Sequence, residues 1–311
     1  METVLITGGT GLIGQALTKE LLAQGYSVII LSRTAKAGGA KHSALSYAQW
    51  DVEQQTIDKE AIRKATYIVH LAGANVAEGR WSESRKREIR ESRTRSGELL
   101  VKALKENPNH VKAVISASAI GWYGPDPLVP NPHPFTETAP PHKDFLGTTC
   151  QEWEDSIKPV LATGHRLVIL RTGIVLSREG GAYKEFEKPL KLGVASVLGN
   201  GNQMVSWIHI ADLVGMYVAA LKHERWHGVY NAVAPAPVSD KELILTIAKQ
   251  RGKFYIQTKV PEVALKAALG EMSIEVLKSA TVSSKKIEEA GYQFLFPNIS
   301  VAVHNLNNKA S

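Results

Sequence analysis

Short apolar runs alternate with amphipathic segments along the first 173 residues of the chain. The apolar runs are rich in β-branched residues and show little polar alternation, which is typical of strands buried on both faces of a parallel sheet. They cover residues 3–7, 27–32, 67–72, 111–118 and 166–173. Helical periodicity links them over residues 12–24, 57–65, 83–106 and 146–162. This alternation predicts a doubly wound parallel α/β sheet with right-handed crossovers.

The pattern is looser after residue 174. Helices are predicted at 180–193 and 239–252, the second with Ser239 as its N-cap, and a strand or turn leads into a helix over 206–223. Short strands are predicted at 228–234 and 253–261. We expect a Rossmann domain, residues 1–173, to which parts of residues 200–235 return. The remainder, residues 174–311, is expected to form a smaller α+β lobe on the substrate side.

A proline-rich segment, residues 124–144, has no helical period. It follows a predicted parallel strand, so it lies at the carboxyl edge of the sheet, where folds of this kind bind ligands. Long irregular loops in compact domains are usually either functional or mobile.

The composition is that of a globular protein, with 311 residues, 44% hydrophobic and 22% charged. No stretch approaches 18 uninterrupted apolar residues, and the N-terminus lacks the pattern of a secretory signal. The single cysteine, Cys150, cannot form an internal disulfide or supply a thiolate zinc cluster alone. We therefore expect a cytoplasmic protein with no membrane association and no metal.

The net charge of +7 is concentrated in residues 80–98, where seven Lys or Arg residues accompany four Glu residues. Opposite charges recur four residues apart, as in Glu83–Arg87 and Glu91–Arg95, which predicts an exposed helix with internal ion pairs. Contact of one or two of these arginines with an anion is the alternative. No aromatic-rich strand motif or zinc-knuckle spacing favours nucleic-acid binding, so no nucleic-acid partner is expected.

The segment "TGGTGLIG", residues 7–14, joins the first predicted strand to the first predicted helix. Gly8 permits a tight turn, Gly11 removes a side chain where a pyrophosphate would approach, and Gly14 lets helix and strand pack closely. Backbone N–H groups and the helix N-terminus can then face a phosphate. The context of strand and helix predicts a dinucleotide-binding loop rather than a purely structural turn.

The end of the second predicted strand indicates which dinucleotide is bound. An acid there would hydrogen-bond the ribose of NAD, but the residues are Ser32 and Arg33, followed by Thr34 and Lys36. A guanidinium beside a hydroxyl suits a 2′-phosphate, so NADP is favoured over NAD. An ordinary surface role for Arg33 is the alternative.

Five motifs together resemble one branch of a known superfamily. These are "TGGTGLIG", "HLAGANV", "SASAIGWYG", "LRTGIVLS" and "WIHIADL". They are similar to the extended and atypical short-chain dehydrogenase/reductases, in the nucleotide-sugar epimerase branch that carries an uncharacterised C-terminal domain. The resemblance extends over nearly the whole chain, because residues 260–294 look like that C-terminal domain.

The resemblance implies a set of cofactor contacts. They are Thr10, Gly11, Leu12 and Ile13 for the pyrophosphate, Ser32 and Arg33 for the 2′-phosphate, Leu71 and Ala72 for the central part, Glu88 and Arg93 from the charged helix, and Val175 at the nicotinamide end. Asp51 resembles the acid that contacts adenine in the wider superfamily, with a surface acid as the equal alternative.

The sequence departs from the superfamily at the catalytic dyad. A Tyr-x-x-x-Lys motif places both side chains on one helical face, where the ammonium lowers the pKa of the phenol. In "FLGTTCQEWE" the corresponding residues are Leu146 and Cys150, so the dyad is missing. A mid-helix cysteine is typical of a small buried hydrophobe, with a weak acid as the alternative.

Ser118 and Tyr123 are the remaining candidates for proton transfer. Ser118 matches the superfamily serine approximately, and Tyr123 follows it in the next loop; structural roles are the alternatives for both. Glu152 and Glu154 are weaker candidates. His209 and Asp212 lack a third ligand nearby, so they do not predict a metal site.

These observations predict an NADP(H)-binding, epimerase-like oxidoreductase acting on a small polar substrate, with a nucleotide sugar as one candidate. Hydride would pass at the nicotinamide C4. The missing dyad leaves a second hypothesis open, a non-catalytic NADP(H)-binding sensor or scaffold. Superfamily relatives often dimerise through the dyad helix, so the resemblance also suggests a homodimer.

Overall fold

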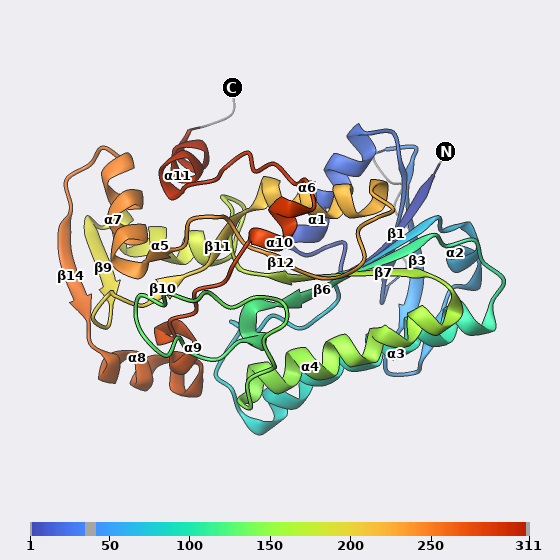
Figure 1. Ribbon diagram of the computed structural model, residues 1–311, viewed down its shortest axis with the longest axis horizontal. Helices are drawn as coiled ribbons and strands as arrows, with labels where there is room; N and C mark the ends of the chain where they lie inside the picture. The colour runs from blue at the N-terminus through green and yellow to red at the C-terminus, as the bar shows by residue number, and fades with distance from the viewer. Residues whose placement is uncertain (1, 35–41, 309–311) are drawn as a thin grey trace.

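A computed structural model of the chain describes residues 2–34 and 42–308. Its centre is an eight-stranded sheet in the order β12-β7-β6-β5-β1-β2-β3-β4 (Figure 1). Neighbouring strands are parallel except for β3 and β4, which are antiparallel. The predicted fold class, a doubly wound parallel sheet with a smaller C-terminal α+β lobe, is confirmed.

Five strands lie where the apolar runs predict them. These are β1 (Thr3–Thr7), β2 (Ser27–Ser32), β5 (Tyr67–His70), β6 (Ala113–Ala119) and β7 (Arg166–Thr172). Sequence analysis missed β3 (Leu45–Asp51) and the short β4 (Thr56–Ile57). These two strands form the edge of the sheet, where β3 is only partly buried and carries polar residues between its apolar ones.

Helices cover both faces of the sheet (Figure 1). On one face α1 (Leu12–Ala23) and α6 (Ile210–Lys222) pack over β1, β2, β5 and β12 (Gly228–Ala232). On the other face lie α2 (Lys59–Lys64), α3 (Glu83–Glu106) and α4 (Phe145–Ile157). The last helix is shorter than predicted, because Pro159 lacks an N–H and the chain continues as a 3₁₀ turn, Lys158–Thr163.

The C-terminal lobe has its own apolar core. Three two-stranded sheets belong to this part of the chain: β8 (Ile174–Leu176) with β11 (Trp207–His209), β9 (Val194–Leu198) with β14 (Ile256–Val260), and β10 (Met204–Val205) with β13 (Val238–Ser239). Its helices are α5 (Ala182–Lys191), α7 (Asp240–Gln250), α8 (Glu262–Leu269), α9 (Ser273–Leu277) and α11 (Ile299–Asn307). The short α10 (Lys285–Glu289) packs instead against β12 of the main sheet through Ile287. Ser239 caps α7 as predicted, since its hydroxyl accepts the N–H of Glu242 at 3.1 Å.

The proline-rich loop, residues 124–144, is fastened to the C-terminal part of the chain. The carboxylate of Asp126 accepts hydrogen bonds from the hydroxyls of Ser279 and Thr281 at 2.7 and 2.8 Å. Phe135 forms an isolated bridge with Val282. Two segments far apart in the sequence are therefore held together beside the carboxyl ends of the strands.

No helix within the described ranges has both the length and the apolar character needed to cross a bilayer.

Candidate functional site

The glycine turn after β1 has a shape that only glycine allows at two positions. Gly8 has a φ of +67°, and a Cβ atom there would lie 2.8 Å from the carbonyl oxygen of Leu71. A Cβ atom on Gly14 would overlap the carbonyl oxygen of Gly8. The first glycine therefore keeps the turn close to the chain after β5, and the last lets α1 start directly against the turn.

The N-terminus of α1 is left open toward solvent. Gly11 is its N-cap and supplies no side-chain hydrogen bond, and the first turn carries no acidic residue. The first N–H groups of a helix have no intrahelical acceptor, so those of this turn are free to bind an anion. Thr10 and Gly11 are exposed, while Leu12 and Ile13 are partly buried.

The predicted phosphate and ribose contacts flank this turn. In the sheet β1 lies between β5 and β2, so Leu71 and Ala72 follow one neighbouring strand, and Ser32 ends the other. Arg33 is exposed just beyond Ser32. Lys36 lies outside the described residues.

Asp51 has a local role that favours the surface alternative. Its carboxylate accepts the N–H groups of Glu53 and Gln54 at 2.8 and 2.9 Å, which shapes the turn between β3 and β4.

A buried pair beneath the turn, Thr7 and His70, was not found by sequence analysis. The Thr7 hydroxyl accepts the N–H groups of Leu71 and Ala72 at 3.1 and 3.2 Å, so it donates its own proton to Nδ1 of His70 at 2.8 Å. Burial lowers the pKa of His70 to about 3, and the ring is neutral. One sequence feature could have indicated this pair: Thr7 and His70 are polar residues at the ends of two otherwise apolar strands, β1 and β5.

Arg93 lies partly buried beside the chain that follows β5. Its guanidinium lies 4.9 Å from the ring centre of Trp153 and donates to the carbonyl of Ile89 at 2.8 Å. A Cβ atom on Gly73 would sit 3.0 Å from Cζ of Arg93. Burial lowers the pKa of Arg93 to about 10, so it is a cation at neutral pH.

The charge of Arg93 is not matched by an acid. No carboxylate of the described residues forms an ion pair with it, and the neighbouring Arg85 opposes it. Glu88 points elsewhere: its carboxylate is mainly exposed and accepts a hydrogen bond from Arg85 at 2.7 Å. An unpaired cation in a partly buried place is costly and favours an anionic partner.

Val175, predicted at the nicotinamide end, lies close to α1. A Cβ atom on Gly181 would be 3.3 Å from a methyl group of Leu12 and 3.6 Å from the carbonyl oxygen of Val175. The chain after β8 therefore meets the first turn of α1, which brings these two predicted contacts together.

The positions of the missing dyad form an apolar surface against Gly121. A Cβ atom on Gly121 would lie 3.2 Å from Cβ of Leu146 and 3.5 Å from Sγ of Cys150. Burial raises the pKa of the Cys150 thiol to about 12, so it is protonated at neutral pH. This pattern agrees with the interpretation of Cys150 as a small buried hydrophobe.

The structure brings Ser118 and Tyr123 into one buried polar network through Glu154 and Arg171. Ser118 donates to the carboxylate of Glu154 at 2.8 Å, and Tyr123 donates to the side chain of Asn231 at 2.6 Å. Tyr123 has no exposed surface, and burial raises its pKa to about 12. In this conformation its phenol is closed off from solvent, and catalytic roles for both residues stay predictions.

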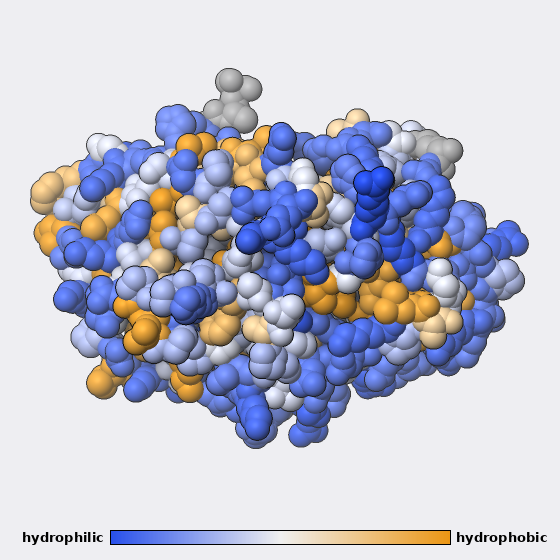
Figure 2. Space-filling view, viewed as in Figure 1, coloured by the Kyte–Doolittle hydropathy of each residue, from blue (hydrophilic) through white to orange (hydrophobic). Residues whose placement is uncertain are grey.

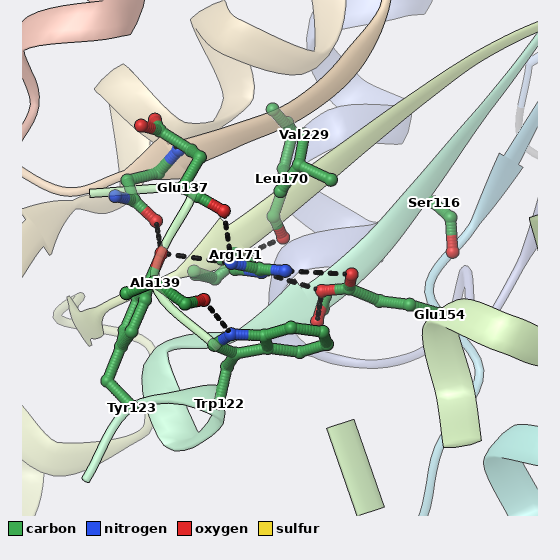
Figure 3. Close-up of polar contacts among 12 residues, drawn as sticks. Ser116, Trp122, Tyr123, Glu137, Ala139, Glu154, Leu170, Arg171 and Val229 are labelled. Carbon is green, nitrogen blue, oxygen red and sulfur yellow. Dashed lines mark hydrogen bonds and ion pairs between the residues drawn. The ribbon is translucent and has the colours of Figure 1, made fainter. Parts of the chain in front are cut away.

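Arg171, on β7, is the centre of this network (Figure 3). Its guanidinium donates to both carboxylate oxygens of Glu154, at 2.7 and 3.0 Å, and to the hydroxyl of Tyr123 at 3.1 Å. It also lies 3.6 Å from the ring centre of Trp122. Arg171 and Glu154 are 2% and 1% exposed, so this is a fully buried, bidentate ion pair.

His209 and Asp212 anchor chain segments at the start of α6. Nδ1 of His209 accepts the N–H of Ala211, while the carboxylate of Asp212 accepts the N–H groups of Leu295 and Phe296 at 2.8 and 3.0 Å. Among the residues that the structure describes, no group of three or more His, Cys, Asp or Glu side chains is placed to hold a metal ion.

Comparison with known proteins adds three findings. The NAD dependent epimerase/dehydratase family matches residues 4–149, and a domain of unknown function, DUF1731, matches residues 260–306. The epimerase family protein SAR0825 of Staphylococcus aureus (strain MRSA252) is 32% identical over 309 residues, covering 99% of this chain and 100% of the relative.

Two solved structures are also similar. The crystal structure of the human epimerase family protein SDR39U1 with NADPH is 29% identical, with a TM-score of 0.85, and the match covers 98% of this chain and 99% of that one. The nucleoside-diphosphate sugar epimerase from Corynebacterium glutamicum is 30% identical, with a TM-score of 0.77, over 98% of this chain and 58% of that one.

Substituting Glu154→Gln should strongly destabilise the fold. The change leaves the buried guanidinium of Arg171 without its counter-charge. We expect a loss of about 3–5 kcal/mol in the free energy of unfolding, measured by urea denaturation. Replacing both partners, Glu154→Leu with Arg171→Met, should cost less than the single change. A single variant within about 1 kcal/mol of the wild type would contradict this structural role.

The stability should fall on acidification in part because of His70. Its pKa is lowered from 6.5 to about 3 in the folded state, so below 6.5 only the unfolded chain binds a proton there. Above pH 6.5 the ring is neutral in both states, so it does not change the free energy of unfolding with pH. As the pH falls from 6.5 toward the folded pKa of about 3, the free energy of unfolding should decrease by about 1.4 kcal/mol per pH unit.

His70→Gln should therefore flatten the decline in the free energy of unfolding between about pH 6 and pH 4. The exposed His227→Gln serves as the control and should leave the slope unchanged. Equal slopes for both variants and the wild type would show that His70 is not held neutral.

Proposed function

The chain belongs to the NAD-dependent epimerase/dehydratase family of short-chain dehydrogenase/reductases, and on that basis we propose that it is an NADP(H)-binding, epimerase-like oxidoreductase. The cofactor would lie across the carboxyl ends of β1, β2 and β5, and the substrate would be a small polar molecule.

The observation that carries the proposal is an open glycine turn next to an unpaired cation. Gly8 packs against Leu71, and two residues later Gly73 covers the guanidinium of Arg93. The turn offers unsatisfied backbone N–H groups, and Arg93 offers a positive charge without an acid. A dinucleotide pyrophosphate supplies the negative charge that both features favour.

The preference for NADP over NAD rests on the end of β2. Ser32 and the exposed Arg33 stand where an acid would select the ribose of NAD. The human relative SDR39U1, whose crystal structure contains NADPH, supports this preference. Ser32 and Arg33 would hold the 2′-phosphate, Leu12 would lie with the glycine turn at the pyrophosphate, and Val175 would border the nicotinamide end.

The cofactor, when bound, supplies hydride transfer at the nicotinamide C4. The protein would hold it at the glycine turn and keep water from its inner side through the apolar Leu146 and Cys150. A nucleotide sugar is one candidate substrate, as the name of the Corynebacterium glutamicum relative suggests. Ser118 is the candidate that would polarise a substrate oxygen, and Tyr123 the second.

A non-catalytic NADP(H) sensor or scaffold is the second candidate function. The apolar dyad positions favour it, as do the hydroxyls of Ser118 and Tyr123, which are engaged with Glu154 and Asn231. Hydride turnover with a panel of carbonyl compounds and nucleotide sugars separates the two functions. Turnover that survives Ser118→Ala would remove Ser118 as a catalytic residue.

A homodimer through α4 is a further proposal from the resemblance. The exposed residues of α3 and α4 are polar or charged without exception: Glu83, Ser84, Arg87, Glu88, Arg90, Glu98, Lys102, Lys105, Glu106, Thr148, Gln151 and Asp155. Stable homodimer interfaces have an apolar centre, so this surface gives the proposal no support.

Arg33→Asp should weaken NADPH binding far more than NADH binding. A hydrogen-bonded charge pair is worth about 1.5–3 kcal/mol, so we expect about a 10- to 100-fold rise in the Kd for NADPH. Isothermal titration of both cofactors measures it, with the exposed Arg225→Asp as the charge-matched control. Equal Kd values for NADPH and NADH in the wild type, or a small uniform loss in the variant, would refute a contact with the 2′-phosphate.

Arg93→Met should separate cofactor binding from stability. The cation has no acidic partner, so an apolar side chain of similar length should leave the free energy of unfolding of the cofactor-free protein within about 1 kcal/mol. The Kd for NADPH should nevertheless rise at least about tenfold. A variant that loses stability but keeps its NADPH affinity would show that Arg93 has a packing role alone.

A further inference from the structure

A surface groove lies between the N-terminal halves of α3 and α4 and gathers four cations. Lys86, Arg87 and Arg90 come from α3, and Lys143 comes from the loop that enters α4. The groove holds about 330 Å³ and is also lined by the hydroxyl-bearing Thr148 and Thr149. Figure 2 shows hydrophilic residues along this lower edge of the molecule, where Figure 1 places α3 and α4.

The two acids of the groove already have partners. Glu83 lies 3.5 Å from Nζ of Lys86. The carboxylate of Asp144 accepts the N–H of Gly147 at 2.7 Å and lies 2.9 Å from Nδ1 of His142 and 3.8 Å from Nζ of Lys278. Neither acid forms an ion pair with Arg87, Arg90 or Lys143.

The four cations differ in how well they are compensated. Lys86 is paired with Glu271 at 2.5 Å, and Arg90 lies 3.6 Å from Glu152. Arg87 and Lys143 form no ion pair with any residue in the described part of the chain. The groove therefore has a cation without an ion pair on each of two walls, Arg87 on α3 and Lys143 in the loop that enters α4.

The groove is separate from the cleft described above. Arg87 and Arg93 are six residues apart on α3, which places their side chains about 120° apart around the helix. Arg93 lies against Gly73, whereas Arg87 is exposed. A ligand of Arg87 and Lys143 would thus lie on the outer side of α3.

We propose that this groove binds a small, multiply charged, phosphate-bearing molecule at a site distinct from the cofactor cleft. Two walls of cations and the hydroxyl of the exposed Thr148 match the charge and the oxygen acceptors of such a ligand, whereas the hydroxyl of Thr149 already donates to the carbonyl of Phe145. The volume is at the lower end of small-molecule sites, which are about 300–1,000 Å³. A single exposed charge contributes little to the affinity for an anion, so binding should require several contacts at once. The affinity should fall as the salt concentration rises, because salt screens these charges.

The groove is less suited to single-stranded nucleic acid. Its aromatic residue, Phe145, already packs edge-on against Trp81 at 5.0 Å and lies beneath Lys86 at 5.6 Å. Sequence-tolerant binding of single strands relies on free aromatic platforms for base stacking.

Isothermal titration of inorganic pyrophosphate tests the proposal. The protein is first saturated with NADPH, so that the cofactor cleft is occupied. We expect a single binding event, at least about tenfold weaker in the double variant Arg87→Gln, Lys143→Gln and weakened by salt in the wild type. The control, Lys102→Gln with Lys105→Gln, removes the same charge from exposed positions further along α3 and should leave binding unchanged.

Three results would overturn the proposal. One is an absence of pyrophosphate binding, and another is an equal loss of affinity in both double variants. The third is tighter binding of a single-stranded oligonucleotide that depends on the same two residues. A failure of NADPH to bind would refute the proposed function alone. The titration is then made on Arg93→Met protein, which lacks the cation that would hold a pyrophosphate in the cofactor cleft, and the two double variants are compared on that background.

Discussion

The buried ion pair between Glu154 and Arg171 is the interaction on which the carboxyl edge of the sheet depends. It joins α4 to β7, and through Ser118 it reaches β6. The same guanidinium binds Tyr123 and the carbonyl of Glu137 at 3.2 Å, and so holds the proline-rich loop. Two charges removed from water are tolerated only with such complete hydrogen bonding. The pair therefore fixes the position of the helix that carries the dyad positions.

This fixed scaffold explains the contrast between the two ends of the site. At the cofactor end, the first turn of α1 has N–H groups without a side-chain cap, and Arg93 is a cation without an ion pair. At the dyad end no such group is free, because the hydroxyls of Ser118 and Tyr123 donate to internal acceptors. Leu146 and Cys150, at the dyad positions, are apolar. Binding of a dinucleotide follows readily from the first condition. Proton transfer needs a free acid or base, and the side chains at the dyad end do not offer one in this conformation.

Much of this arrangement could be predicted from local patterns. Buried parallel strands give continuous apolar runs, and the glycine spacing requires a turn whose geometry the structure shows at Gly8 and Gly14. Sequence analysis missed β3, near the edge of the sheet, because a half-exposed strand does not form a continuous apolar run. Thr7 with His70, and Glu154 with Arg171, pair residues 63 and 17 positions apart. Such partners depend on the tertiary packing, and a single sequence does not reveal it.

The crystal structure of the complex with NADPH tests the central claim most directly, through the distance between the Arg93 guanidinium and the nearest cofactor oxygen. We predict a hydrogen-bond distance, with the pyrophosphate over residues 10–13 and the 2′-phosphate beside Arg33. A cofactor bound elsewhere, or bound in this cleft with Arg93 still contacting only the carbonyl of Ile89 and the ring of Trp153, would contradict the account.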